Sequence, residues 1–462
     1  MVSTSKAHKR LFTFASCLGI VLVQLDVSIV NVGLHSLKEA YSASVSDLEW
    51  VINAYALVFA ALMLSSGSVV DRLGSRKTFI IGVLVFIFAS VFCALAPTIY
   101  WLDFMRGVQG VGAALLLPSS LTLLRQYFPD SGERTAAIAL WASSGALALV
   151  AGPVLGGVLI KYLGWKSIFL VNFPLGLLSI AIIYWLAQAG TVSPVKINYP
   201  VQFLIASGLA LLTFTLTEAG QSGWENPVIM FTLVAGLLML YAYRRFDSQA
   251  DNPVISREGL SNPLITRAVA VGFLCNLVFY GAVFIFSIFF QNKLHLSALE
   301  TGLAFMPMMT LTAGVNYCSK WFVNWLSVRS LSLLGSVISL AGFGTVMFIS
   351  PEWTATQLFI PMILLGSGTS LAMPVMTNLV LSQATSQTAG SASALFNCAR
   401  QMGGVTGVAI FGLLLSSAGG DNMTGGLKMV SLAASGLTII WLMAGLKALP
   451  AKKLHYLHNA QE

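Results

Sequence analysis

The chain has 462 residues, of which 56% are hydrophobic and only 9% are charged. Soluble proteins carry a charge on roughly a quarter of their residues, so this composition excludes an ordinary soluble protein and predicts a membrane protein that crosses the bilayer several times. The net charge of +8 does not indicate nucleic-acid binding, because the lysines and arginines are distributed between apolar runs and do not cluster.

The first apolar run, 11-34, contains the acid Asp26 and follows a basic stretch made of Lys6, Lys9 and Arg10. The run is too long for the hydrophobic region of a signal peptide and no small-residue cleavage site follows it, so we predict an uncleaved span. As a helix, it would place Asp26 roughly 22 Å from the inner end and ~12 Å from the outer end. A charged carboxylate facing lipid there costs ~2.5 kcal/mol or more, so Asp26 is a functional-site candidate.

Fourteen apolar runs are long enough to span a bilayer. They cover residues 11-34, 48-70, 78-96, 99-122, 135-160, 167-187, 199-217, 227-243, 267-290, 300-323, 330-349, 356-380, 391-416 and 427-446. An even number of spans places both termini on one side of the membrane. Most of the 25 lysines and arginines fall in connections on the N-terminal side, which predicts that both termini are cytoplasmic. We expect a multi-pass monomer in the cell's inner, or cytoplasmic, membrane.

The longest internal connection, 244-267, follows the eighth span and contains prolines and charges typical of a cytoplasmic linker. It divides the chain into an N-terminal six-helix half, two extra transmembrane helices with the linker, and a C-terminal six-helix half. These parts cover 11-187, 188-266 and 267-446. Two six-helix halves with a binding cavity at mid-membrane are the architecture of many secondary transporters.

The connection between spans two and three contains glycines and charges at close spacing. Its proposed gate residues are Gly67, Asp71, Arg72, Gly74 and Arg76. The stretch resembles the signature loop of the major facilitator superfamily. The resemblance implies that the glycines permit a tight turn and close helix contact, and that the charges form a breakable cytoplasmic latch between the halves. An acid such as Asp71 could sit at a helix N-terminus, where the helix dipole favours it. The alternative is an ordinary basic cytoplasmic loop.

Span four places Arg106 about 8 Å below the outer surface, close to the depth of Asp26. An arginine at this depth needs a partner, which is either Asp26 or, three residues earlier on the same helix, Asp103. The pattern of Arg106, Gln109 and the following glycine resembles a superfamily motif associated with proton coupling. A purely structural pair of Arg106 with Asp103 is the alternative.

Span five carries small residues at the spacing that lets helix backbones touch. Gly152 and Gly156 are four residues apart, and Pro153 beside them favours a bend. Taken alone, this spacing indicates only packing. Together with Gly145 and Gly157, the pattern resembles the motif of the antiporter branch of the superfamily.

The stretch from Asp26 to Asn31 resembles the first-helix motif of the fourteen-span drug:proton antiporter family. Later segments resemble the same family, so the resemblance covers nearly the whole chain; they are 290-291, 298-307, 366-374 and 397-404. The resemblance implies an all-α membrane protein with the major facilitator fold, built from two six-helix halves plus two additional transmembrane helices. It implies that Asp26, Asn31, Arg106 and Gln109 serve proton coupling or substrate binding.

Two further groups of residues are candidates. Arg400 lies about ten residues into span thirteen, where it could extend to the cytoplasmic interface and act in the gate, or serve as a cation on the substrate path. Aromatic and methionine side chains could line an adaptable apolar pocket, although such residues more often pack or face lipid. The pocket candidates are Tyr55, Phe59, Tyr280, Phe284 and Met306.

These features predict a proton-coupled efflux transporter, a drug:H+ antiporter that exports lipophilic, cationic compounds by alternating access. Protons from outside would displace the substrate at Asp26, the sole acid deep inside a span, and their loss to the inside would reset the site. One alternative is export of a neutral or anionic metabolite, siderophore or antibiotic, with Arg106 or Arg400 meeting the anion. Another is a non-transporting membrane sensor or scaffold on a transporter fold.

No pattern in the sequence predicts catalysis. It shows no nucleophile-base pair, metal cluster or phosphate-binding loop, so we do not expect an enzyme. The expected partners are a small-molecule substrate, protons and the lipid bilayer. No cofactor and no catalytic or metal site is expected, because the proton gradient would supply the energy.

Overall fold

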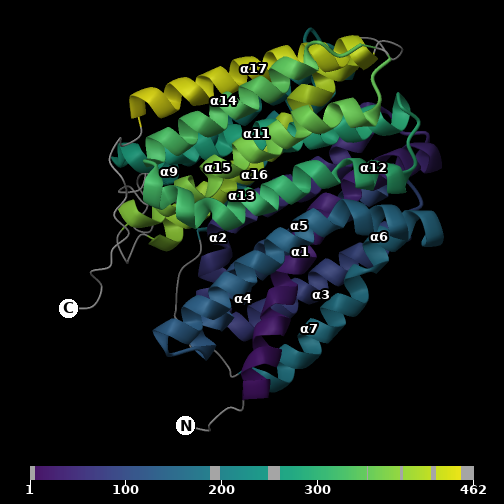
Figure 1. Ribbon diagram of the computed structural model, residues 1–462. Helices are drawn as coiled ribbons and strands as arrows, with labels where there is room; N and C mark the ends of the chain where they lie inside the picture. Colours follow the sequence, from purple (N-terminus) through teal and green to yellow (C-terminus); the bar gives the residue numbers. More distant parts are fainter. Residues whose placement is uncertain are drawn as a thin grey trace. The chain divides into compact units, whose positions relative to one another are not determined.

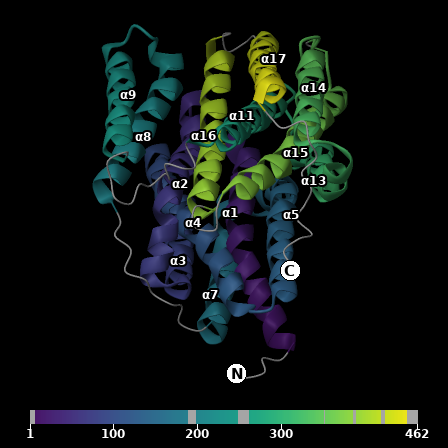
Figure 2. The same ribbon diagram turned by 90° about the vertical axis from the view of Figure 1, so that its left-hand side faces the viewer.

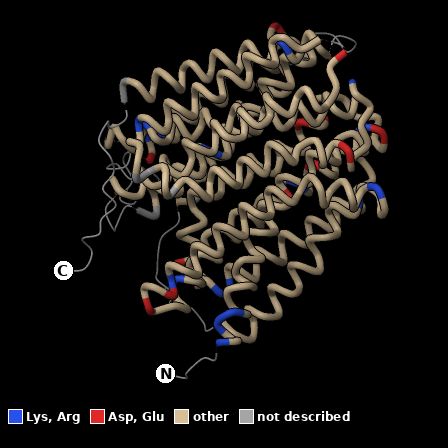
Figure 3. Tube along the Cα trace, viewed as in Figure 1, with Lys and Arg blue, Asp and Glu red and all other residues tan. Residues whose placement is uncertain are grey.

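The computed structural model describes residues 6–187, 198–247, 261–350, 352–384, 389–417 and 423–448. Within these ranges the chain forms α-helices joined by short connections, with one short 3-10 helix and no strand. Thirteen helical segments of the described part are long and apolar enough to cross a membrane. Acidic and basic residues lie mostly near the helix ends, and few interrupt the middle portions (Figure 3). This distribution is that of an all-α membrane protein.

The contacts between residues divide the chain into two compact units. The first unit comprises Met1–Thr215, Pro227–Arg244 and His295–Leu303. Its helices, labelled in Figures 1 and 2, are α1 (Lys6–Tyr41), α2 (Val45–Leu73), α3 (Ser75–Ala94), α4 (Ile99–Tyr127), α5 (Ser131–Leu163), α6 (Ser167–Leu170), α7 (Asn172–Leu186), most of α8 (Tyr199–Ser222) and α9 (Pro227–Asp247), and nearly all of α12 (Ala298–Ala304).

The second unit comprises Leu216–Asn226, Arg245–Leu294 and Ala304–Glu462. Its main elements are α11 (Pro263–Asn292), α13 (Met306–Trp325), α14 (Val328–Val346), the 3-10 helix η1 (Ala355–Leu358), α15 (Phe359–Gln383), α16 (Ala389–Ser417) and α17 (Met423–Ala448). Its core includes the fully buried Trp441 of α17, whose indole N–H donates a 3.0 Å hydrogen bond to Ser332 Oγ of α14.

Helix α1 lies at the centre of the first unit and contacts α5, α7 and α4. It begins and ends outside the predicted run 11-34, so Asp26 lies near the middle of a longer helix. Nearly every residue from Phe12 to Leu34 is buried or half-buried, although the sequence there includes polar side chains. The surrounding helices therefore have to supply hydrogen-bond partners to those side chains.

The two helices predicted as additional spans, α8 and α9, group with the first unit. Figure 2 shows them side by side, and Thr215 of α8 and Thr232 of α9 share a 2.9 Å hydroxyl hydrogen bond. Gln202 of α8 donates to the carbonyl of Ala61 and accepts from the hydroxyl of Ser65, both on α2. These polar contacts attach α8 to α2. Residues 188–197 and 248–260 of the predicted middle segment, 188-266, lie outside the described residues.

The tenth predicted span, 300-323, is not one continuous helix. It is divided into the short helix α12 and the longer helix α13, which meet at Phe305. Pro307 lies in the first turn of α13, where its missing backbone N–H is tolerated. The break separates the beginning of the predicted span from the rest, and α12 packs with the first unit.

Candidate functional site

A buried ion pair joins α1 and α4. Arg106 Nη1 donates to Asp26 Oδ2 at 2.5 Å, and the exposed fractions of the two side chains are 2% and 0%. The structure thus brings together the two residues that the sequence matched by depth. It shows no ion pair between Arg106 and Asp103, the alternative partner, among the described residues.

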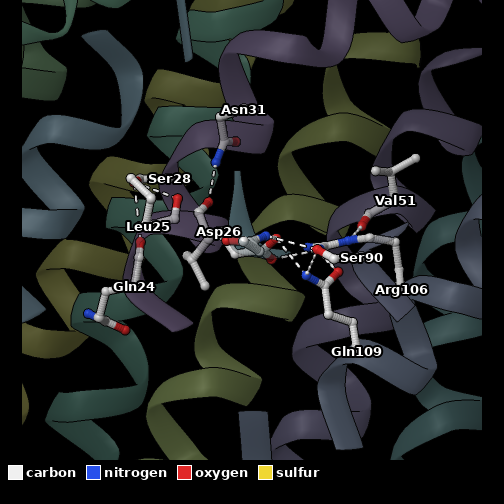
Figure 4. A network of polar contacts seen from close by, with 11 residues as sticks. Gln24, Leu25, Asp26, Ser28, Asn31, Val51, Ser90, Arg106 and Gln109 are labelled. Atoms are coloured by element: carbon white, nitrogen blue, oxygen red, sulfur yellow. Dashed lines mark hydrogen bonds and ion pairs between the residues drawn. The ribbon is translucent and has the colours of Figure 1, made fainter. Parts of the chain in front are cut away.

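Neutral side chains from three helices complete the surroundings of the carboxylate (Figure 4). Gln109 of α4 accepts from Arg106 Nη1 at 2.7 Å and donates to Asp26 Oδ1 at 2.8 Å. Asn172 of α7 also donates to Asp26 Oδ1, at 3.4 Å. Both amides donate to Ser90 Oγ of α3, at 3.0 Å from Gln109 and 2.9 Å from Asn172.

Sequence reasoning missed Ser90 and Asn172. Each is fully buried, with an exposed fraction of 0%. The available signal was a polar residue inside an apolar span, which is weak because serine and asparagine can also bond to their own helix. Asn31, which the sequence did select, behaves in that second way: its amide donates to Val27 O at 2.9 Å, and Figure 4 shows it apart from the cluster.

Arg106 is held on its other side by α2. Its Nε donates to the carbonyl of Val51 at 2.9 Å, and its guanidinium carbon lies 4.4 Å from the centre of the Tyr55 ring. A cation over an aromatic face is attracted by the ring quadrupole, most strongly where water is excluded. Tyr55, predicted as a pocket residue, therefore covers the arginine, and it is itself buried against Phe86.

The two buried charges of Asp26 and Arg106 stabilise each other, so the stability of this site depends on both charges being present. Two ions taken out of water are tolerated only if they meet each other and their remaining polar atoms are satisfied. Here the carboxylate accepts three hydrogen bonds from Arg106, Gln109 and Asn172. Removing the charge of one partner leaves the other buried and uncompensated, which typically costs ~3–5 kcal/mol.

The glycine motif of α5 lies against α1 close to this pair. An added Cβ at Gly152 would overlap Ser28 Oγ, and one at Gly156 would lie 2.7 Å from Ile29 Cγ1. Gly145 faces Ile20 in the same way, at 2.6 Å. The close approach predicted from the small residues is present, and its contacts on α1 run from Ile20 to Ile29, on both sides of Asp26.

The other side of the α5 motif meets α12. A Cβ at Gly157 would lie 2.6 Å from Leu299 Cα, and one at Gly302 would overlap the carbonyl of Pro153. The motif is therefore packed between α1 and α12 within the first unit. Two segments far apart in the sequence, each resembling an antiporter motif, are in direct contact.

The tight turn predicted between spans two and three is formed by Gly74. Helix α2 ends at Leu73, α3 begins at Ser75, and Gly74 between them has a φ of 83°. This left-handed conformation strains residues that have a Cβ, so glycine is required here. Close helix contact was also expected at Gly67, but no described atom lies within 4 Å of a Cβ built there.

The charged residues of this loop have separate surroundings. Asp71 is exposed in the last turn of α2, so its own helix does not offer it an N-terminus. Arg72 is exposed in the same turn. Arg76 Nη2 donates to the carbonyl of Tyr184 at 2.6 Å, and its guanidinium lies 5.0 Å from the Tyr184 ring centre. Arg76 thus ties the start of α3 to the end of α7 inside the first unit.

Most of the predicted pocket side chains are buried in their own unit. Phe59 and Phe284 have exposed fractions of 2% and 0%, whereas Met306 is 45% exposed. Tyr280 is half-buried on α11 and packs edge-on against Phe279. Arg400 on α16 has electrostatic contact with Tyr280, which places it beside the middle of α11. Tyr55 and Phe59 belong to the first unit, and Tyr280, Phe284 and Met306 to the second.

Comparison with known proteins identifies the family. A sequence profile described as the Major Facilitator Superfamily matches residues 16–408. The chain belongs to the major facilitator superfamily. Superfamily membership makes it a transporter and a multi-pass membrane protein rather than an enzyme, in agreement with the apolar helices and the small-residue packing described above.

Several known proteins are similar over most of their length. The methylenomycin A resistance protein of Bacillus subtilis (strain 168) is 31% identical over 399 residues, covering 86% of each chain. A methylenomycin A resistance protein of Streptomyces coelicolor is 33% identical, covering 86% of this chain and 84% of its own. The drug efflux pump JefA of Mycobacterium tuberculosis is 30% identical, covering 89% and 81%.

Solved transporter structures share the fold. A POT family transporter in complex with 5-aminolevulinic acid superposes with a TM-score of 0.71 at 11% identity, covering 97% of this chain and 98% of its own. A bacterial homologue of the human lysosomal transporter Spinster gives 0.67 at 14% identity, covering 96% and 98%. At these identities the likeness extends to the superfamily fold alone.

Proposed function

We propose that this superfamily member exports lipophilic small molecules across a bacterial cytoplasmic membrane in exchange for protons, as a fourteen-span drug:proton antiporter. Relatives named for methylenomycin A resistance and for drug efflux support the export of drug-like compounds. The motifs of the first, fourth and fifth helices support the antiporter subgroup, since they resemble it and lie together in space. We also propose cytoplasmic termini, from the distribution of basic residues, and a monomeric protein.

The buried ion pair between Asp26 and Arg106 is the observation that supports proton coupling. A proton on Asp26 would remove the negative charge and turn one carboxylate oxygen from an acceptor into a donor. That oxygen would then face the donors of Arg106, Gln109 and Asn172, so the network would have to rearrange. One proton thereby selects between two arrangements of the first unit.

Other titratable groups near Asp26 come from three neighbouring helices. Arg106 and Asp103 come from α4, Tyr55 from α2 and Cys93 from α3. Asp26 is the acid that contacts the arginine directly. It is therefore the residue whose protonation would release Arg106. The rearranged network would transmit that change to α1 and, through Ser28, to the glycines of α5 that pack against α1.

The transport cycle follows from alternating access. A proton entering from outside would neutralise Asp26 and favour release of the substrate outside. Loss of the proton to the cytoplasm would restore the ion pair and reset the protein for another substrate. The proton gradient supplies the energy, so the cycle needs no cofactor.

Two versions of this proposal differ in the charge of the substrate. In the first, a lipophilic cation binds at Asp26, which requires the cation to replace Arg106 in its 2.5 Å contact. In the second, the substrate is neutral or anionic and binds elsewhere. The second version is favoured by one observation, namely that Arg106 is neutralised by Asp26 whereas Arg400 has no carboxylate partner among the described residues.

The test is transport by the purified protein in proteoliposomes under an imposed pH gradient. A panel of lipophilic cations, neutral compounds and anions, including methylenomycin A, is added, and proton and compound movements are followed together. We expect Asp26→Asn to abolish coupled export while the protein remains folded in the membrane. The matched control is Asp103→Asn, which removes an acid of α4 that does not pair with Arg106.

Each outcome decides the proposal. Coupled export by Asp26→Asn at the wild-type rate would eliminate Asp26 as the proton site. A wild-type protein that moves neither protons nor any compound of the panel would favour the sensor or scaffold alternative. A cation that is exported with protons, and whose binding is lost in Asp26→Asn, would select the first version over the second.

A further inference from the structure

Arg400 is a cation that forms no ion pair within the described part of the second unit. Its Nη1 donates weakly to Asn397 Oδ1, at 3.4 Å on the same helix, and its Nε is buried without a hydrogen bond. Its guanidinium carbon lies 5.8 Å from the centre of the Phe396 ring. No carboxylate forms an ion pair with it among the residues that the structure describes.

The location of Arg400 is deep rather than interfacial. Its electrostatic neighbours, Cys275 and Tyr280, lie in the middle of the thirty-residue helix α11. At about 1.5 Å per residue, Tyr280 is roughly 25 Å from the beginning of that helix. An arginine that extends to the membrane surface by its flexible stem would instead lie beside a helix end.

The helices that hold Arg400 are in close backbone contact. A Cβ at Gly403 would overlap the carbonyl of Phe273, and one at Gly407 would overlap that of Leu277. One at Gly404 would lie 3.1 Å from the Tyr280 ring. This packing holds α16 against α11 over the two turns that follow Arg400, so the backbone next to Arg400 is fixed by helix contacts.

Arg106 and Arg400 differ in the acceptors that surround their guanidinium groups. Arg106 has a carboxylate, an amide and a carbonyl as acceptors, and its charge is compensated. Arg400 lies further from the beginning of its helix than Arg106 does, and within the described part of the chain its hydrogen-bond acceptor is one amide oxygen. A guanidinium is strongly selective for carboxylates and phosphates, because its planar N–H donors match their two oxygens.

We propose that Arg400 binds a carboxylate, or a similar anionic group, of an exported lipophilic substrate. Asn397 orients the guanidinium, since its own amide N–H is held by Ser393 O at 3.0 Å and its oxygen faces Arg400. Tyr280 supplies an uncharged hydroxyl-bearing neighbour. This inference rests on the proposed export function and narrows its substrate class to anions. An anionic lipid headgroup has the same chemistry, and the experiment separates the two sources.

The experiment measures ligand binding to the full-length protein in nanodiscs, without a pH gradient. The probes are fusidic acid, nalidixic acid and 1-pyrenebutyric acid, each compared with its methyl ester. We expect Arg400→Gln to weaken binding of at least one acid about tenfold or more, because a charged hydrogen bond is lost. The ester should bind the wild type and the variant alike. Arg400→Lys should retain part of the affinity, since it keeps the charge but not the two-pronged geometry.

Controls exclude misfolding and general charge effects. Arg329→Gln removes a guanidinium from the first turn of α14 in the same unit and should leave acid binding unchanged. Melting temperatures identify any variant that fails to fold. If Arg400→Gln does not fold, the acid affinity of Arg400→Lys alone tests the proposal. Nanodiscs of phosphatidylcholine are compared with nanodiscs containing phosphatidylglycerol. Acid binding that is equal in both supports a substrate site, whereas full displacement of the acids by phosphatidylglycerol would overturn it in favour of a lipid site.

The remaining outcomes are also decisive. Equal binding of acids by the wild type and Arg400→Gln would overturn the proposal, as would failure of the wild type to bind any of the three acids. Asp26→Asn serves as the reference for the export function. If this variant retains both acid binding and proton-coupled export, the anion site stands and only the coupling proposal fails.

Discussion

Ser28 of α1 lies directly against Gly152 of α5, so closely that a single added carbon on the glycine would overlap the serine hydroxyl. The contact is two residues beyond Asp26 on the same helix. The buried carboxylate and the small-residue seam are therefore parts of one rigid segment. A movement of α1 that follows a change at Asp26 has to be accommodated by α5, and through Gly157 by α12.

Substituting Gly152 with alanine should damage both packing and transport. The new Cβ would meet Ser28 and the backbone N of Ile29, and overpacking of this kind costs typically ~1–3 kcal/mol. Thermal unfolding in detergent and pH-driven export in proteoliposomes measure the two effects. Gly344→Ala in α14 is the matched control, because no contact within 4 Å is found for a Cβ built there. Equal behaviour of the two variants would show that the seam has no mechanical role.

The ion pair should show strong coupling in a double-mutant cycle. Asp26→Asn alone leaves the Arg106 charge buried, and Arg106→Gln alone leaves the carboxylate buried, each at ~3–5 kcal/mol. The double variant removes both charges, so it should be more stable than the sum of the single effects predicts. Its export should nevertheless be uncoupled from protons. Additive stability effects would mean that the two side chains do not interact in the membrane.

Substitution of Ser90 should reduce stability and coupled export more than substitution of an equally buried serine elsewhere. Its hydroxyl accepts from both Gln109 and Asn172, so Ser90→Ala would leave two buried amides short of an acceptor, at ~1–3 kcal/mol each. Ser119 of α4 is also fully buried, but among the described residues its hydroxyl bonds to carbonyls of its own helix. We therefore expect Ser119→Ala to resemble the wild type in unfolding and in export. A Ser90→Ala protein with wild-type stability and coupling would remove Ser90 from the site.

Substitutions of Arg76 and of Asp71 should have different effects on stability and export, although both residues lie in one motif. Arg76→Ala removes the contacts with the Tyr184 carbonyl and ring, so we expect lower thermal stability by roughly 1–3 kcal/mol. Asp71→Asn changes an exposed side chain and should leave unfolding unchanged while slowing export, as a gate residue would. The exposed Lys77→Ala serves as the control for charge removal in the same turn. If Asp71→Asn exports normally, the latch hypothesis for this residue is wrong.

The sequence by itself determined the class of protein and most of its helices. Long apolar runs can cross a bilayer only as structures that satisfy their own backbone hydrogen bonds, so composition and length predicted a multi-span helical protein. The same physics singled out Asp26 and Arg106, since a charge in an apolar run requires a partner at similar depth. Gly74 could also be predicted, because a one-residue turn between helices requires a positive φ.

Only the tertiary structure decided which partners meet. Asp26 and Asp103 were both within reach of Arg106 in the sequence, and the packing of α1 against α4 selected Asp26. Ser90 and Asn172 joined the site because α3 and α7 bring them to the same carboxylate, whereas the similar side chain of Asn31 bonds within α1. Small polar residues give no sequence signal for this difference, since their own helix offers them an equally near acceptor. Whether Arg400 meets a carboxylate depends likewise on which helices surround it, and none of the described residues forms an ion pair with it.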